Sequence, residues 1–289
     1  MRLLLLLLCL TGAITVGAAE EDAAPITREA FEASLEYQQG AVTLPNGVAV
    51  LKLPAGFRYL NPEDTRRVLE QAWGNPEGGG TLGMLFPSDV GPLDAHGWGV
   101  VITYEEDGHV SDDDADGIDY DKLMKEMQEA TTADNTERAK QGQPTLDLVG
   151  WAARPYYDKA AHKLHWAKEL RVPSASENTL NYNIRILGRK GVLVLNAVSG
   201  MSQLPTIQER MKDVLAYTEF SPGNGYADFD PDIDKTAAYG LAALVAGGAA
   251  AKAGLFAKLI AVAIALKKFL VLAVVAVFAA VRKLFARKQ

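Results

Sequence analysis

The sequence contains a single cysteine, Cys9, among its 289 residues. Disulfide frameworks, thiol nucleophiles and cysteine metal sites all need cysteines in the folded part of the chain. Cys9 instead lies in an apolar run at the N-terminus. A lipoprotein attachment cysteine would need a longer apolar stretch before it and a small residue in place of Leu8. We therefore expect a folded domain without cysteine chemistry.

The N-terminus has the composition of a secretory signal peptide. It reads MRLLLLLLCLTGAITVGAAEED, with one arginine, an unbroken apolar run and small residues before the first acids. A basic start, a short apolar stretch and an A-x-A-like end are the parts of such a signal. We predict that residues 1–19 are a signal peptide, cleaved near Ala18 or Ala19. The alternative is an uncleaved N-terminal anchor, for which the run is short.

Acidic residues are absent from residues 236–289, where two apolar tracts flank Lys267–Lys268. A membrane-spanning helix needs about 20 predominantly apolar residues, and the first tract is long enough. We predict that residues 236–289 are a C-terminal membrane anchor with a basic cytoplasmic tail. The transmembrane helical segment is placed within about 239–266, followed by an interfacial or re-entrant segment over 269–281.

Two lysines complicate this anchor, because Lys252 and Lys258 would each cost about 2.5 to 3.5 kcal/mol near a bilayer centre. The alternatives are a helix over about 253–281 or a two-helix hairpin. A secreted N-terminal side and a basic cytoplasmic end require an odd number of crossings, which disfavours the hairpin.

Small residues in the same segment have spacings that let membrane helices approach closely. They include Gly240, Gly247, Gly248 and Gly254. We therefore expect the bilayer as one partner, and a homo-oligomer through these glycines as another.

The charges of the chain are divided unevenly. Residues 20–235 contain all 36 acids and 20 of the 29 lysines and arginines, which gives a net charge of −16, whereas residues 236–289 have a net charge of +8. Phosphates would be repelled by so acidic a domain. We expect no nucleic-acid partner.

Residues 20–235 are predicted to form one extracytoplasmic domain, because no linker rich in Pro, Gly or Ser divides them. Helical spacing and caps alternate with β-branched runs. Helices are predicted at 27–38, 61–76, 118–142 and 205–217, and strands within 40–60, 81–87, 97–110, 145–152, 156–172, 180–188 and 191–200. The segment 156–172 is either one strand or a strand that folds back on itself. This order indicates an α+β fold, an antiparallel sheet covered by helices.

Three sequence blocks carry a family resemblance. They are GWAARPYYDKAAHKLHWAKEL, NYNIRILGRKGVLVLNAV and GYADFDPDIDKTAAYGLAALVAGG. They resemble the signature blocks of a bacterial family of predicted membrane-anchored proteins, domain of unknown function 2167. The resemblance implies an envelope protein with a signal peptide and a C-terminal anchor. Together with the basic C-terminal end, this predicts a protein of the bacterial inner membrane, with its soluble domain in the periplasm and its C-terminus in the cytoplasm. The resemblance brings no activity, catalytic residue or cofactor.

The stretch HVSDDDADGIDYDKLM resembles the front half of a calcium loop. Asp112, Asp114 and Asp116 take positions 1, 3 and 5 of an EF-hand loop, but Leu123 stands at position 12, where a bidentate glutamate should close the shell. The alternative is a solvated helix start, with Asp116 or Asp119 as cap. We expect at most a weak, structural calcium site at the three aspartates.

Two pairs of residues are candidates for other chemistry. His162 and His165 point to opposite faces if both lie on one strand, so they share a metal only if His162 sits in a turn. Asp94 and His96 share a face if extended, but they lack a third ligand or a nucleophile. An envelope hydrolase with a site near Asp94 and His96 is nevertheless the main enzymatic alternative.

Two motif-like stretches have plainer interpretations. NPEGGGTLG has no GK[ST] after it and no strand before it, which favours a flexible loop. Ser199 has Ala197 and Met201 where a G-x-S-x-G elbow has glycines. We therefore predict no catalytic residue and no cofactor, and we leave catalysis open while favouring its absence.

Aromatic residues gather around the central predicted strands. As a hypothesis they line a groove for a peptide, glycan or lipid; the alternative is core packing. They are Trp98, Tyr104, Trp151, Tyr156, Tyr157, Trp166 and Tyr182.

These observations together favour a membrane-anchored envelope protein that acts as a non-catalytic binding, assembly or homeostasis module, with an envelope protein as a further partner. The alternatives are the hydrolase and an oligomeric membrane assembly component.

Overall fold

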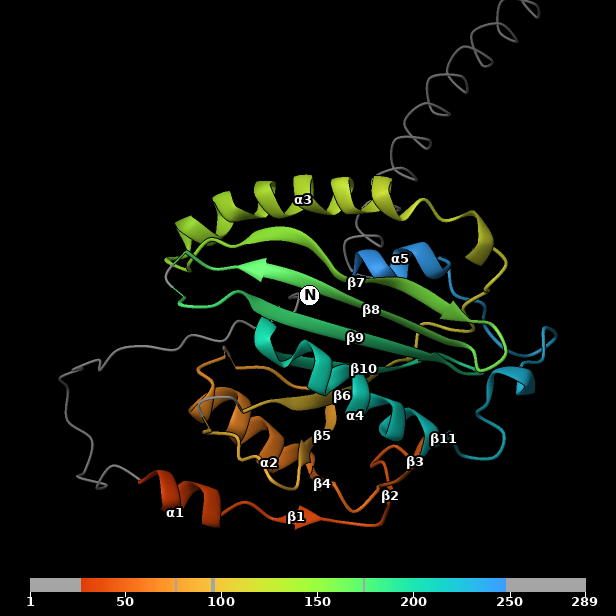
Figure 1. Cartoon of the computed structure of the whole chain (residues 1–289). Coiled ribbons are helices and arrows are strands. Elements are labelled where there is room, and N and C mark those ends of the chain that lie inside the picture. The colour runs from red at the N-terminus through yellow and green to blue at the C-terminus, as the bar shows by residue number, and fades with distance from the viewer. Residues whose placement is uncertain (1–26, 76, 95–96, 174, 248–289) are drawn as a thin grey trace, which may run out of the picture. The chain divides into compact units, whose positions relative to one another are not determined.

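The computed structural model describes residues 27–75, 77–94, 97–173 and 175–247 (Figure 1). The compact unit that contains the folded domain ends at Val245. The predicted signal peptide, and the part of the predicted anchor from residue 248 onward, lie outside the described residues.

The centre of the domain is a large antiparallel sheet, which confirms the predicted α+β fold (Figure 1). Eight strands of the described chain form it, in the order β1-β4-β5-β6-β10-β9-β8-β7. In that order they are β1 (Tyr37–Gln38), β4 (Phe57–Leu60), β5 (Thr81–Pro87), β6 (Gly99–Glu105), β10 (Val192–Gly200), β9 (Thr179–Leu187), β8 (Lys163–Arg171) and β7 (Asp147–Asp158).

Two strand pairs follow the sequence prediction closely. β9 and β10 form the predicted hairpin, with Val192 opposite Leu187 and the Arg189–Lys190 turn between the strands. β2 (Ala41–Thr43) and β3 (Ala49–Lys52) pair antiparallel around the predicted turn, and β11 (Thr218–Phe220) adds to β3 in a small second sheet. β7 is longer than expected, and the chain turns back after it through His162, whose φ is 51°.

Two helices, α2 and α3, begin at capping residues that the sequence predicts. Asn61 accepts a hydrogen bond from Asp64 N, and Asp119 accepts from Asp121 N and Lys122 N at 3.1 and 3.0 Å. The α-helices are α1 (Arg28–Ala33), α2 (Pro62–Arg67), α3 (Tyr120–Lys140), α4 (Leu204–Ala216) and α5 (Leu241–Ala246), with a π-turn (Val68–Ala72) continuing α2 and 3-10 turns at Ala115–Gly117, Met201–Gln203 and Tyr226–Asp228.

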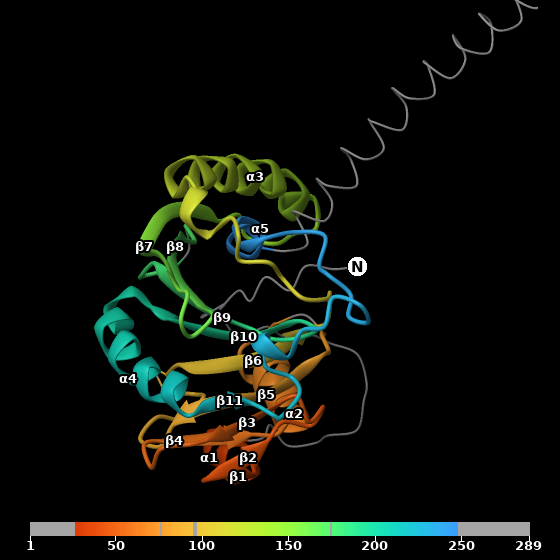
Figure 2. The ribbon, with the colours of Figure 1, turned by 90° about the vertical axis from the view of Figure 1, so that its right-hand side faces the viewer.

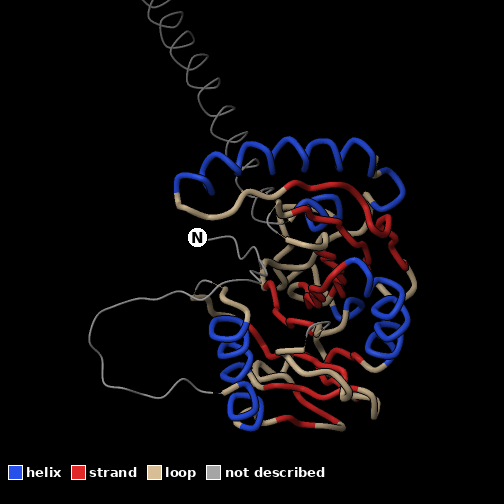
Figure 3. The backbone as a smooth tube through the Cα atoms, turned by 60° about the vertical axis from the view of Figure 1, so that its left-hand side comes forward, coloured by secondary structure: helices blue, strands red, loops and turns tan. Residues whose placement is uncertain are grey.

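Both faces of the large sheet are covered, as Figure 2 shows with α4 on one side and α2 and α5 on the other. On the first face, α4 and the small sheet enclose a hydrophobic cluster with side chains such as Leu51, Ile184 and Met211. The other face has two separate clusters. One packs α1 and α2 on β4–β6, and the second packs α5 on β8–β10, with α3 lying along β7 (Figure 3).

The second cluster corrects the predicted start of the membrane segment. The crossing is predicted from about Tyr239, yet Leu241, Leu244 and Val245 are at most 1% exposed and pack inside the domain. No helix within the described residues is both long and apolar enough to cross a membrane.

Candidate functional site

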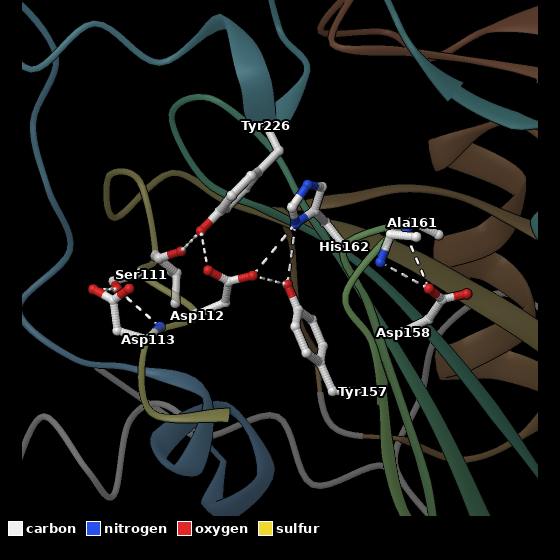
Figure 4. Close-up of polar contacts among 10 residues, drawn as sticks. Ser111, Asp112, Asp113, Tyr157, Asp158, Ala161, His162 and Tyr226 are labelled. Atoms are coloured by element: carbon white, nitrogen blue, oxygen red, sulfur yellow. Dashed lines mark hydrogen bonds and ion pairs between the residues drawn. The ribbon is translucent and has the colours of Figure 1, made fainter. Parts of the chain in front are cut away.

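The acidic stretch after β6 supplies the centre of a polar cluster, which Figure 4 shows. The Tyr157 hydroxyl, at the end of β7, donates to Asp112 Oδ2 at 2.7 Å. The Tyr226 hydroxyl, on the 3-10 turn far along the chain, donates to Asp112 Oδ1 at 3.1 Å. His162 completes what we call the Asp112 cluster: its Nδ1 lies 3.2 Å from the Tyr157 hydroxyl and 3.5 Å from Asp112 Oδ2.

Aromatic stacking extends this cluster inward. The His162 ring stacks on Tyr226 with centroids 4.0 Å apart, and His109 lies on the Tyr226 ring at 4.3 Å. Phe229 stacks on His109 at 3.9 Å. His109 is 8% exposed, and burial lowers its pKa, although the carbonyls of Gly188 and Arg189 act in the opposite direction. A neutral imidazole between two rings is therefore a packing element at physiological pH.

The protonation states in the cluster suit hydrogen bonding. Burial raises the pKa of Asp112, but the hydroxyls of Tyr157 and Tyr226 and the nearby His162 outweigh it, so the pKa is lowered. Burial and the Asp112 carboxylate raise the pKa of Tyr157, and the same two causes raise the pKa of Tyr226 to about 12. At neutral pH an ionised carboxylate accepts from two neutral phenols.

This arrangement does not provide an activated nucleophile. Both phenols are held protonated, and both oxygens of Asp112 are engaged by hydroxyl donors. General acid or base catalysis needs a group whose pKa is near the working pH and whose proton reaches a substrate. The Asp112 cluster instead satisfies its own polar groups, which is the behaviour of a structural lock.

Through Tyr226, the Asp112 cluster holds the segment that we call the C-terminal strap, residues 221–245. His109 N donates to the Lys235 carbonyl at 2.8 Å, and Ala237 N donates to the His109 carbonyl at 2.8 Å. These bonds make a short parallel bridge between His109 and Thr236. Gly108 permits the approach, because a Cβ there would lie 2.6 Å from the Lys235 carbonyl oxygen.

Charged and polar side chains add further attachments along the strap. Arg189 Nε lies 2.6 Å from Asp234 Oδ2, and the side chain of Asp234 is 3% exposed. The Tyr239 hydroxyl donates to Asp107 at 2.7 Å. Asp114 accepts from Leu241 N at 3.1 Å, at the start of α5. The strap is thus fixed from its first turn to the helix that ends it.

The predicted calcium ligands do not gather around one point. Asp112 serves the two tyrosines, Asp114 accepts from the amides of α5, and Asp116 lies exposed in a 3-10 turn. Asp119, not Asp116, caps α3. Within the described part of the chain, no group of three or more His, Cys, Asp or Glu side chains is placed to hold a metal ion. The calcium site stays a prediction without geometric support.

The other candidate residues have separate surroundings. Asp94 forms an ion pair with Arg28 and accepts from Gly91 N at 2.6 Å, while His96 lies outside the described residues. His162 does sit in a turn, but its neighbour is Asp112, whereas His165 packs beside Tyr156 at 6.1 Å. Ser199 is 2% exposed and donates to the Gly200 carbonyl.

The aromatic hypothesis is decided mainly in favour of packing. Trp98 and Trp166 are each 1% exposed and Tyr182 is 8% exposed. Tyr157 belongs to the Asp112 cluster, and Tyr156 is 64% exposed. These rings therefore do not line a common groove.

Sequence reasoning missed Tyr226 and His109 as members of one site. They are more than 100 residues apart in the chain, and the two stretches that contain them gave no sign of contacting each other. The available signal was the aromatic and acidic block GYADFDPDIDKTAAYG, which supplies Tyr226, Phe229 and Asp234.

Comparison with known proteins places the chain in a family. The family described as "Protein of unknown function (DUF2167)" matches residues 36–278. The chain belongs to this family. The DUF2167 match begins just before β1, so it covers both sheets, the Asp112 cluster and the strap but leaves out α1. No curated protein matches the sequence.

Two solved structures give distant likenesses. The solution structure of cyanobacterial PsbP (CyanoP) from Synechocystis sp. PCC 6803 is 10% identical, with 71% of this chain and 99% of that chain covered and a TM-score of 0.34. The Saccharomyces cerevisiae Ran-binding protein Mog1p is 11% identical, with coverages of 64% and 96% and a TM-score of 0.33. Likenesses this weak carry no argument about the DUF2167 chain.

Proposed function

We propose that this protein is a membrane-anchored envelope domain of the bacterial periplasm, acting as a non-catalytic binding or assembly module. The N-terminal signal-like segment and the apolar C-terminal tract support this location. The observation that carries the proposal is the strap, which is held on the domain up to Val245, directly before the apolar tract.

The strap supports a role in which the orientation of the domain relative to its partner matters. A simple tether needs only a flexible linker rich in glycine and serine. Here the chain is bound at His109, Arg189, Asp107 and Asp114 before the tract begins. Ordering so many residues costs conformational entropy, which a flexible tether would avoid. A fixed exit from the domain is useful when a partner in or on the membrane must meet a particular surface.

The glycines that are predicted to form a homo-oligomer interface have different structural surroundings. A Cβ at Gly240 would lie 2.6 Å from Asp114 Oδ2, so its small size serves the contact with α5. Gly247 ends α5 with φ of 96°. Gly248 and Gly254 lie outside the described residues. A homo-oligomer through Gly247, Gly248 and Gly254 remains compatible with the proposal.

The anchor is tested by extraction of membranes with alkaline carbonate. The full-length protein should stay with the membranes, whereas a chain that ends at Gly247 should be released. Ending the chain at Gly247 keeps Leu241, Leu244 and Val245 in the core, which a shorter chain would not. Release of the full-length protein would contradict membrane anchoring.

The assembly role is tested by inserting about ten Gly/Ser residues after Gly247. The partner cross-linked to the full-length protein in its own membranes should be lost, because the fixed exit is replaced by a flexible one. The same insertion after the exposed Gly79 is the matched control and should leave cross-linking intact. Unchanged capture with both insertions would contradict a role for the fixed exit.

A further inference from the structure

Polar residues interrupt the apolar face of the large sheet between its two hydrophobic clusters. Residues directly opposite each other on neighbouring strands point to the same face. Trp166 of β8 lies opposite Asn183 of β9, which lies opposite Asn196 of β10. Lys168 and Arg185 share this face and lie on opposite sides of the Trp166–Asn183 pair, because Lys168 is opposite Asn181 and Arg185 is opposite Leu164. This part of the face therefore presents cations and amides where a covered sheet normally has aliphatic side chains.

Within the described part of the chain, these two part-buried cations have few polar partners. Among the described residues, Lys168 makes no hydrogen bond and no ion pair. Arg185 donates to the carbonyl of the neighbouring Ile184 at 3.2 Å, and its guanidinium lies over the Trp166 ring at 5.1 Å. Burial and then the charge of Arg185 lower the pKa of Lys168 to about 8, and burial lowers the pKa of Arg185 to about 10.

Two neighbouring polar atoms are also unpartnered. The indole of Trp166 is 1% exposed, and its Nε1 has no hydrogen-bond partner in the described structure. Asn196 Oδ1 is buried without a partner as well. An amide can present its NH₂ in the place of its oxygen after a half turn of the side chain. We call Trp166, Lys168, Arg185 and Asn196 the cationic strip.

Such a set is costly to keep without a ligand. A buried donor without an acceptor costs about 1 to 3 kcal/mol, and a buried charge costs more. Arg185 lies between Leu164 and Val194, two members of the cluster beneath α5, so an apolar residue there would continue that cluster. Polar groups that a fold leaves unsatisfied commonly belong to a functional site.

We propose that the cationic strip binds an oxyanion, the phosphate or carboxylate group of a small ligand. Arg185 offers a planar fork that matches two oxygens, and Lys168 adds a point charge. Trp166 Nε1–H and the amide of Asn196 supply neutral donors. The Glu105 carboxylate acts on Arg185 through space but forms no ion pair with it among the described residues, so the positive charge stays available.

This inference rests on the proposed role as a binding module but not on the membrane anchor. Carbonate extraction and anion binding can therefore fail independently of each other. The source of the oxyanion is left to the experiment: inorganic phosphate, a short dicarboxylate such as succinate, and a short-chain anionic phospholipid share the recognised group.

The experiment is a calorimetric titration of the full-length protein in a non-ionic detergent with each of the three probes. At least one probe should bind with a saturable isotherm. Lys168→Met and Arg185→Met should each weaken that binding at least tenfold, and Lys168→Arg should restore part of it. The exposed Lys159, in the turn between β7 and β8, gives the matched control, and Lys159→Met should bind as the wild type does.

A second measurement reports on the strip itself. Binding should change the tryptophan fluorescence of the wild type, because Trp166 gains an acceptor beside Arg185, and Trp166→Phe should remove that change. If Lys159→Met and Lys168→Met weaken probe binding equally, the probe binds to general surface charge, and the proposal is overturned. Absence of saturable binding by phosphate, succinate and the phospholipid would also overturn it.

Discussion

The Asp112 cluster and the cationic strip both combine aromatic rings with charged groups, yet they differ in how far those groups are satisfied. In the Asp112 cluster, each carboxylate oxygen accepts a phenolic proton, and rings stack around it. In the cationic strip, Lys168 and Trp166 Nε1 have no partner among the described residues. A satisfied network fixes the chain, whereas an unsatisfied one keeps its binding capacity for something outside the domain.

The largest effect should come from removing the centre of the satisfied network. Asp112→Ala leaves two part-buried hydroxyls without their acceptor and should lower the free energy of unfolding by about 3 kcal/mol. Urea denaturation measures the change. Asp113→Ala is the matched control, because Asp113 is exposed and its described contacts are with Ser111, so it should change stability by less than about 0.5 kcal/mol. If the two variants lose equal unfolding free energy, the Asp112 cluster is not the stabilising network described above.

The charge of Asp112 should make its contribution depend on pH. Its pKa is lowered in the folded state, so the folded protein favours the ionised form. The stabilisation is present above the unfolded pKa of about 3.9 and is lost as pH falls through the folded value. Asp112→Asn should be less stable than the wild type at pH 7, and the difference in unfolding free energy should shrink as pH falls below about 3.9. A difference that stays constant as pH falls below this value would exclude this origin.

Removing a cation from the cationic strip should raise the free energy of unfolding, where removing Asp112 lowers it. Lys168→Met removes a desolvated ammonium that has no ion-pair partner within the described residues. It should raise the free energy of unfolding by about 1 kcal/mol without ligand, while oxyanion binding is lost. The folded pKa of Lys168 is lowered to about 8 from its usual 10.5, so the penalty is fully present below pH 8. Wild-type stability should then rise relative to the variant as pH increases from about 8 to 10.5. Destabilisation by Lys168→Met at pH 7 would show that the strip is structural.

The smallest effect concerns calcium. Asp112 and Asp114 already accept hydrogen bonds from hydroxyls and amides. A calorimetric titration with millimolar calcium should therefore show no heat of binding at these aspartates. Calorimetry of the wild type and Asp116→Ala makes the measurement. Heat that disappears in Asp116→Ala would restore the loose calcium site.

Local signals made most of the fold predictable. Asn61 with Pro62 marked the start of α2, and the Arg189–Lys190 turn marked the β9–β10 hairpin, because caps and tight turns depend on neighbouring residues. The Asp112 cluster was only half visible. The acidic stretch was noticed, but its function depends on Tyr157 and Tyr226, which the topology brings from other parts of the chain.

The cationic strip and the strap were missed for different physical reasons. Lys168 and Arg185 look like ordinary strand charges until the register places them on a covered face. Leu241, Leu244 and Val245 match the composition of the apolar tract that follows, so hydropathy assigned them to the membrane. Composition cannot separate an apolar helix that packs on protein from one that packs on lipid.

The strap also sets an order of events during synthesis. The residues that complete the cluster beneath α5 are the last ones of the domain, 40 or more positions after the final large-sheet strand ends at Gly200. A growing chain that has released only β1 to β10 still exposes Leu164, Trp166 and Val194. The domain can therefore close this part of its core only after Val245 has emerged, so that maturation is timed by the arrival of the C-terminal segment.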